Sequence, residues 1–141
     1  MNRRQFLNNS ALIGTGLLTG VELFSQAIPK IGANDTLNVG VIGTGDRGGG
    51  LINIMNQLPQ FKVVAVADTL PFRLERGKKL APKGVKTYKD YKKLLDDKSV
   101  DAVIIATPLS THYQIAVDAF QAGKHIYCEK TMCYQIEEAL D

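Results

Sequence analysis

The fold of this chain can be read from one stretch, Leu37-Asn38-Val39-Gly40-Val41-Ile42-Gly43-Thr44-Gly45-Asp46-Arg47-Gly48. Its first six residues form a short run rich in β-branched side chains, which predicts a buried strand. Its last six match the pattern G-x-G-x-x-G. Apolar residues then recur at helical spacing and predict a helix with one apolar face, made of Leu51, Ile54, Met55 and Leu58. A glycine-rich turn between a strand and a helix is typical of a phosphate-binding element.

Each glycine of this turn has its own expected role. Gly43 permits the tight turn, Gly45 lets a pyrophosphate approach the backbone, and Gly48 allows helix and strand to pack closely. The helix N-terminus offers unpaired N–H groups to the anion. We therefore expect a dinucleotide to bind the whole turn, a set of six residues: Gly43, Thr44, Gly45, Asp46, Arg47 and Gly48. The alternative is a structural turn without a ligand.

Downstream of this turn, apolar strands alternate with helical patterns. The expected strands cover residues 61–67, about 85–87, 101–106 and 125–128, and helices are expected at about 71–80, around 91–95, at 111–122 and from 135 onward. Strands that are apolar along their whole length indicate a parallel sheet covered on both faces. The predicted fold class is therefore α/β, a doubly wound, Rossmann-like parallel sheet. A length of 141 residues predicts one core, which we assign to residues 37–141.

The helix predicted at residues 111–122 has the clearest end signals. Thr111 and Gln114 have the spacing of a capping box, and Gly123 is expected to end the helix. Its expected buried face consists of Ile115, Ala116, Ala119 and Phe120.

An acidic residue stands where the second predicted strand ends. A carboxylate at Asp68 can accept hydrogen bonds from the adenine-side ribose hydroxyls and would repel a 2′-phosphate. This favours NAD as the cofactor over NADP, although Arg47 and Arg73 can weaken that preference. The alternative is that Asp68 only caps the strand end.

Composition excludes several other classes of protein. Hydrophobic residues make up 45% of the chain and charged residues 22%, so neither disorder nor a collagen-like structure is indicated. The net charge of +3 is small and the basic residues alternate with acidic ones, which argues against nucleic acid as a partner. Two cysteines and two histidines provide no metal framework and no disulfide scaffold, and we expect both thiols to be free.

Residues 1–36 are interpreted as an export signal and a linker. Arg3 and Arg4 precede a mildly apolar, glycine-containing stretch at 11–24, which is too short for a bilayer core that takes about 20 apolar residues to cross. Asn2-Arg3-Arg4-Gln5-Phe6-Leu7 resembles the twin-arginine signal, so we expect export to the periplasm. A frayed N-terminal helix and an uncleaved membrane anchor are the alternatives.

Two later motifs resemble a known family. They are Asp101-Ala102-Val103-Ile104-Ile105-Ala106-Thr107-Pro108 with His112 after it, and Ala122-Gly123-Lys124-His125-Ile126-Tyr127-Cys128-Glu129-Lys130. With the glycine turn, they make residues 37–141 similar to the nucleotide-binding half of the Gfo/Idh/MocA oxidoreductases. The resemblance implies a chain that stops before the last strand and before a C-terminal α/β domain, which would bind the substrate and drive homo-oligomerisation.

The resemblance also implies roles for single residues. Thr107 and Pro108 would line the cofactor crevice, His112 would face it, and Glu129 would bind the nicotinamide-side ribose. Lys130 would be the catalytic residue, because a lysine amine there can orient the reacting hydroxyl and share its proton. His112 and Lys130 could instead be ordinary surface residues. The family usually has proline where this chain has Thr131, and we still expect the turn to form.

Three functions remain open at this point. The first is an NAD-dependent oxidoreductase that transfers hydride between nicotinamide and a hydroxyl-bearing carbon of a carbohydrate or polyol. The second is an NAD-dependent glycosidase with transient oxidation of the sugar ring, and the third is a non-catalytic dinucleotide-binding module.

Overall fold

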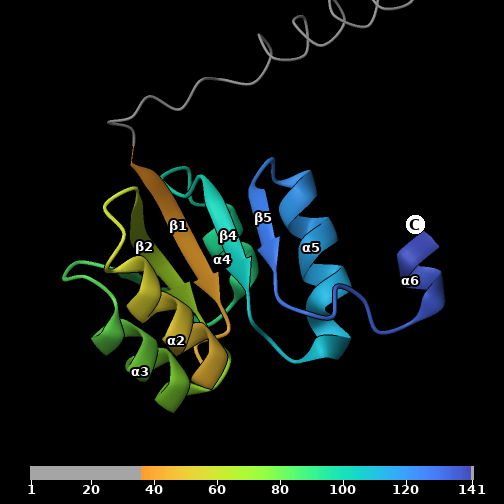
Figure 1. Ribbon diagram of the computed structural model, residues 1–141, viewed down its shortest axis with the longest axis horizontal. Coiled ribbons are helices and arrows are strands. Elements are labelled where there is room, and N and C mark those ends of the chain that lie inside the picture. The colour runs from red at the N-terminus through yellow and green to blue at the C-terminus, as the bar shows by residue number, and fades with distance from the viewer. Residues whose placement is uncertain (1–35, 141) are drawn as a thin grey trace, which may run out of the picture. The chain divides into compact units, whose positions relative to one another are not determined.

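The computed structural model describes residues 36–140, which form one parallel sheet with helices on both faces (Figure 1). Its strands are β1 (Leu37–Ile42), β2 (Phe61–Ala67), β3 (Lys86–Tyr88), β4 (Ala102–Ile105) and β5 (His125–Cys128). Their order across the sheet is β3-β2-β1-β4-β5, and every neighbouring pair is parallel. The predicted fold class is confirmed. The predicted signal and linker lie outside the described residues, apart from Thr36.

Helices connect each strand to the next, as a parallel sheet requires, and one further helix follows β5. They are α2 (Asp46–Met55), α3 (Pro71–Leu80), α4 (Tyr91–Leu95), the 3-10 turn η1 (Leu109–Thr111), α5 (His112–Gln121) and α6 (Ile136–Leu140). The chain moves outward from β1 through β2 to β3, and then returns to place β4 on the other side of β1. The strand order therefore reverses between β1 and β4.

The sheet separates two hydrophobic clusters. On one face, Ile52 and Met55 of α2 pack with Val39 and Val41 of β1. On the other face, Leu94 of α4 and Ile115 and Ala119 of α5 pack with residues that include Ile42, Ala67 and Ile105. Figure 1 shows the same division, with α2 and α3 in front of the sheet and α4 behind it. β4 is apolar along its whole length, and β1 and β2 are apolar after Asn38 and Lys62, because these parts of the strands are covered on both faces.

The predicted apolar face of α2 is wrong in part. Ile54 is 52% exposed and Leu58 is 40% exposed, whereas Ile52 is fully buried. The buried side of the helix begins with Gly48 and Gly49, so it is rotated away from the stripe that side-chain hydrophobicity alone suggested. Close backbone packing at these glycines sets the orientation of the helix.

Two expectations for α5 are also wrong. Phe120 is 78% exposed, because α5 turns Ile115 and Ala119 toward the sheet and Phe120 follows Ala119 by about 100° around the helix. The capping box does not form, since the Thr111 hydroxyl donates to the Pro108 carbonyl inside η1 and Gln114 donates to Asp118. A preceding 3-10 turn replaces the expected cap.

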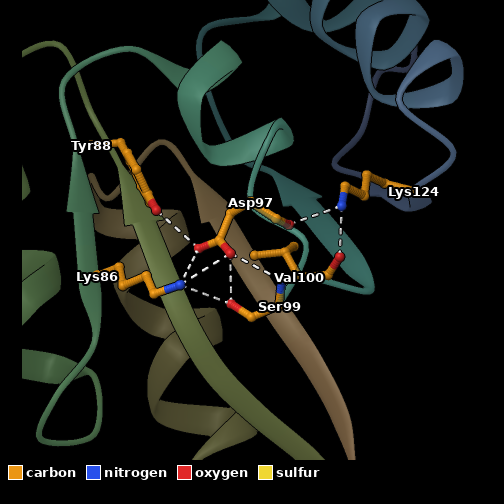
Figure 2. A network of polar contacts seen from close by, with 6 residues as sticks. All are labelled: Lys86, Tyr88, Asp97, Ser99, Val100 and Lys124. Carbon is orange, nitrogen blue, oxygen red and sulfur yellow. Dashed lines mark hydrogen bonds and ion pairs between the residues drawn. The ribbon is translucent and has the colours of Figure 1, made fainter.

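A buried carboxylate ties the β3 edge of the sheet to the loop before β4 (Figure 2). The Asp97 side chain accepts hydrogen bonds from Lys86 Nζ at 2.8 Å, from the Tyr88 hydroxyl at 2.9 Å and from Ser99. From the other direction, Lys124 Nζ donates to the carbonyls of Asp97 and Val100. The bond to Lys86 is the main reason why the pKa of Asp97 lies far below its usual range.

Candidate dinucleotide-binding site

A cavity of about 660 Å³ opens where the carboxyl ends of β1, β2 and β4 meet, beside the reversal of strand order. In open α/β sheets, this reversal is the place where ligands bind. The volume lies within the range of cofactor sites. Of the predicted site residues, the cavity lining includes Gly43, Gly45, Asp46, Arg47, Asp68, Thr107 and Pro108.

The glycine turn has the geometry predicted for it at two positions. Gly43 has a φ of +87°, and a Cβ atom there would lie 2.7 Å from the carbonyl oxygen of Ala106. A Cβ atom on Gly48 would lie only 1.9 Å from the carbonyl oxygen of Gly43. Side chains at these positions would force α2 and the turn apart. The close approach of backbone to backbone therefore requires glycine at both.

The first turn of α2 faces this cavity without a side-chain cap. Gly45 is the N-cap and has no side chain that could bind the free N–H groups of the helix. Asp46, the first helical residue, lines the cavity, but its carboxylate is paired with Arg76 at 2.5 Å. That bond with Arg76 lowers the pKa of Asp46. The N–H groups at the start of α2 have no side-chain cap, and Arg76 partly balances the charge of Asp46, so this helix N-terminus is suited to an anion.

The carboxylate of Asp68 is held in place by backbone groups. One oxygen accepts a hydrogen bond from the Thr44 amide at 2.9 Å, and the other accepts one from the Leu70 amide at 2.9 Å. The buried Thr44 hydroxyl donates to the Arg73 carbonyl at 2.7 Å. Asp68 also lines the cavity, and a carboxylate can accept about four hydrogen bonds. It retains acceptor capacity for ribose hydroxyls.

At the other end of the site, the chain after β5 is held by an ion pair. Arg47, in the glycine turn, contacts Glu129 with 2.6 Å between Nη2 and Oε1. Glu129 is 8% exposed, and its hydrogen bond with Arg47 lowers its pKa. The backbone amide of Glu129 donates to the carbonyl of Ile105, which continues the pairing of β5 with β4. Two remote segments, the turn after β1 and the turn after β5, are thus joined.

Glu129, Lys130 and His112 are not among the residues that line this cavity, although Glu129 contacts Arg47 and His112 contacts Thr107, which do line it. Lys130 is exposed, and the peptide bond between Lys130 and Thr131 is cis. His112 is buried, with Nδ1 2.8 Å from the Thr131 carbonyl oxygen and Nε2 2.9 Å from the Thr107 carbonyl oxygen. The roles predicted for these three residues stay predictions.

Sequence reasoning missed several residues that line the cavity. Lys89 and Tyr91 follow β3, and Gln114 lies on α5. A usable signal existed for the first two, because all parallel strands direct their carboxyl ends to the same edge of the sheet. The Tyr91 hydroxyl donates to Asp118 at 2.7 Å, and burial together with this bond raises the pKa of Tyr91 to about 12. This bond joins α4 to α5 along the wall of the cavity.

Within residues 36–140, no group of three or more His, Cys, Asp or Glu side chains is arranged to hold a metal ion. Over the same residues, no helix has the length and apolar character needed to span a bilayer. Cys128 and Cys133 are free thiols, as predicted, and burial raises the pKa of Cys128.

A glycine turn at a helix N-terminus, an acid at the end of β2 and a cavity at the strand reversal together define a dinucleotide-binding Rossmann domain. Residues 37–141 match the Gfo/Idh/MocA family, described as an oxidoreductase family with an NAD-binding Rossmann fold, and the chain belongs to this family. The resemblance read from the sequence is confirmed.

Relatives and solved structures agree with this assignment. A glycosyl hydrolase family 109 protein from Shewanella pealeana is 30% identical over 98% of this chain and 35% of its own length. Myo-inositol dehydrogenase from Lactobacillus casei, solved with NAD(H) and myo-inositol, has 32% identity and a TM-score of 0.70 over 74% of this chain and 31% of that chain. The 3-ketoreductase KijD10 from Actinomadura kijaniata, solved with NADP, has 28% identity and a TM-score of 0.68. The match covers 75% of this chain and 32% of that chain. The chain thus spans about a third of the length of these proteins.

Proposed function

We propose that this chain is the NAD-binding part of an oxidoreductase that moves hydride between nicotinamide and a hydroxyl-bearing carbon of a carbohydrate or polyol. The observation that carries the proposal is Asp68, an acid lining the cavity at the end of β2 and fixed by the amides of Thr44 and Leu70. An acid in this position suits the free ribose hydroxyls of NAD and disfavours a 2′-phosphate. The inositol substrate of one structural relative supports the substrate class.

The residues of this chain fit the cofactor along its whole length. Backbone amides at the start of α2 would bind the pyrophosphate, and Gly45 would leave room for it. Asp68 would bind the adenine-side ribose, Thr107 and Pro108 would line the nicotinamide half of the crevice, and Glu129 would bind the second ribose. NAD would supply the hydride acceptor or donor.

Lys130 is the proposed catalytic residue on this chain. An alcohol that loses hydride must also lose its hydroxyl proton. The amine form of Lys130 would accept a hydrogen bond from that hydroxyl, take up its proton at Nζ and so become an ammonium. Glu129, the preceding residue, is anchored by Arg47, which keeps the backbone that carries Lys130 next to the glycine turn. A second acid–base group and the substrate-binding surface belong to the length of the relatives that this chain does not cover.

A second candidate function is supported by the names of the relatives. Several are glycosyl hydrolase family 109 proteins, which makes an NAD-dependent glycosidase the alternative to a dehydrogenase. Such an enzyme oxidises a ring hydroxyl only transiently and forms no net NADH. In a polypeptide that also carries the remaining length of the relatives, accumulation of NADH on a polyol supports the dehydrogenase. Release of an aryl leaving group without NADH supports the glycosidase, and tight NAD binding with neither activity supports a binding module.

We also propose the location and assembly of the protein. The twin-arginine pattern at Arg3 and Arg4 supports export to the periplasm, by a route that carries folded proteins with their cofactor already bound. Homo-oligomerisation is proposed for the full-length enzyme.

The binding proposal can be tested on the chain itself with Asp68→Ala. The variant loses the hydrogen bonds between the ribose hydroxyls and a charged acceptor, which is expected to weaken NADH binding about tenfold or more. It also loses the negative charge that repels a 2′-phosphate, so the preference for NADH over NADPH is expected to become smaller. Titration by nucleotide fluorescence measures both affinities. Asp96→Ala, an exposed acid outside the cavity lining, is the control. An unchanged ratio of NADH to NADPH affinity in Asp68→Ala would contradict the ribose assignment.

A further inference from the structure

His112 is a buried polar residue whose two ring nitrogens both face backbone carbonyls. Its side chain is 2% exposed, although it lies in the first turn of α5 beside the cavity. Nδ1 is 2.8 Å from the carbonyl oxygen of Thr131, and Nε2 is 2.9 Å from that of Thr107. A carbonyl oxygen can only accept, so a ring nitrogen that carries a hydrogen donates to the carbonyl it faces, and the tautomer decides which nitrogen that is. Both nitrogens of this buried ring lie against backbone carbonyls, so neither is available to a cofactor or a substrate.

The two carbonyls belong to the two turns that form the nicotinamide end of the proposed site. Thr107 follows β4 and lines the cavity, and Thr131 directly follows Lys130. The regular pairing of β4 with β5 extends only to Ile105 and Cys128, and one further bond joins the Glu129 amide to Ile105. Beyond that bond, the chain leaves the sheet. His112 spans the gap between the two turns where strand pairing no longer does so.

We infer that His112 is a positioning residue that fixes the turn of Glu129 and Lys130 against the Thr107 wall of the cofactor site. It acts through the Thr131 carbonyl, while Arg47 holds Glu129 from the opposite side of the same turn. Loss of His112 removes the ring that contacts both carbonyls, and it frees the backbone on which Glu129 and Lys130 are placed. The inference rests on the proposed function, in which this turn meets the nicotinamide half of NAD.

The turn that carries Glu129 and Lys130 can be tested separately from the rest of the site, because ADP and NADH would occupy different parts of the site. ADP contacts the glycine turn and Asp68, whereas NADH also reaches Glu129 and Lys130. His112→Leu removes the imidazole N–H and both ring contacts, and it is expected to weaken NADH binding about tenfold with ADP binding unchanged. His112→Gln keeps a donor and is expected to lose less. His125→Gln, at the other histidine of the chain, which is exposed on β5, is the control.

A double-mutant cycle with Glu129 tests whether substitution of His112 weakens NADH binding through the turn that carries Glu129. Because both substitutions act on the same turn, His112→Gln and Glu129→Gln are expected to weaken NADH binding together by less than the product of their separate effects. Equal loss of NADH and ADP affinity in both His112 variants would overturn the inference, since it would indicate general damage to the fold. Unchanged NADH affinity in both variants would overturn it as well.

Amide hydrogen exchange of the ligand-free chain gives a readout that does not need the cofactor. His112→Leu is expected to speed exchange about tenfold at Glu129 and Lys130, whose amides bond to the Ile105 carbonyl and to the Glu129 carboxylate, while the core amides of β1 and β2 keep their protection. Unchanged exchange at these two residues would overturn the inference. Failure of the wild-type chain to bind either nucleotide would instead contradict the proposed function, and the exchange measurement would still decide the role of His112.

Discussion

Single residues of the glycine turn have different tolerance for a side chain, although they share one motif. A Cβ atom at Gly48 would meet the carbonyl oxygen of Gly43 at 1.9 Å, whereas nothing lies within 4 Å of a Cβ atom placed on Gly50. Both residues belong to α2. The contact between the helix and the turn requires glycine at position 48, whereas Gly50 lowers helix stability without any packing benefit.

The pair Gly48→Ala and Gly50→Ala tests this difference. Gly48→Ala is expected to lower the free energy of unfolding by about 1–3 kcal/mol and to weaken NADH binding, because α2 must move away from the turn. Gly50→Ala is expected to raise the free energy of unfolding by about 0.5–1 kcal/mol, because alanine favours the helix. Urea denaturation measures both. Similar stability of the two variants would show that close packing at Gly48 is not what the site requires.

Among the elements, β3 depends most on polar contacts. It is only Lys86–Tyr88 and pairs with β2 along three residues, so its own hydrogen bonds and apolar burial are limited. The Asp97 carboxylate binds both ends of this strand through Lys86 and Tyr88 (Figure 2). The Asp97 side chain is 8% exposed, whereas that of Lys86 is 53% exposed. The contribution to stability therefore comes from a largely buried acceptor with several donors, more than from a surface ion pair.

Asp97→Asn is expected to lower the free energy of unfolding at neutral pH by about 1–3 kcal/mol. The bond with Lys86 lowers the pKa of Asp97, so the native state favours the ionised form. The stabilisation is therefore fully present above the unfolded-state pKa of about 4, and it is lost as the pH falls toward the lower native value. Thermal unfolding between pH 7 and pH 3 should show the two proteins converging at low pH.

The exposed neighbour supplies the control for that experiment. Asp96→Asn removes an adjacent carboxylate that is exposed to solvent, so its unfolding curve should follow that of the wild type across the pH range. A constant difference between Asp97→Asn and the wild type down to pH 3 would contradict the assigned role of the buried carboxylate.

Across the whole molecule, the site is assembled from segments that are distant in the sequence. The glycine turn, Asp68, Thr107 and Glu129 follow four different strands, β1, β2, β4 and β5. Parallel pairing brings the carboxyl ends of these strands to one edge of the sheet, and the reversal between β1 and β4 opens the cavity there. The described residues thus form the nucleotide-binding unit, and the N-terminal stretch is proposed to deliver it.

Replacement of Arg3 and Arg4 together by lysine tests that delivery. Both charges are retained, but the twin-arginine pattern is lost, so export is expected to stop while the precursor accumulates inside the cell. Fractionation followed by immunodetection of the chain measures this. Replacement of Lys30 by arginine, in the predicted linker, is a control that should leave export unchanged. Continued periplasmic delivery of the double variant would remove the twin-arginine proposal.

The local sequence pattern was sufficient to predict the order of strands and helices and the position of the glycine turn. A strand that is buried on both faces must be apolar throughout, and a turn in which backbone meets backbone must contain glycine, so both leave a direct trace in the sequence. For this reason β1, β2, α3 and the glycine turn have the predicted limits or lie within a residue of them. The Cys128 and Cys133 thiols are free, as their surroundings in the sequence indicated.

Helix orientation and contacts between distant segments required the tertiary structure. The burial of Ile52 in place of Ile54, and the exposure of Phe120, follow from how α2 and α5 rotate against the sheet. Neither the ion pair of Arg47 with Glu129 nor the contact of His112 with Thr131 is visible in sequence spacing, because the partners meet only when β1, β4 and β5 pair. The residue type at a position reflects local requirements such as backbone conformation and burial. The partner that a side chain contacts depends instead on packing among segments that are distant along the chain.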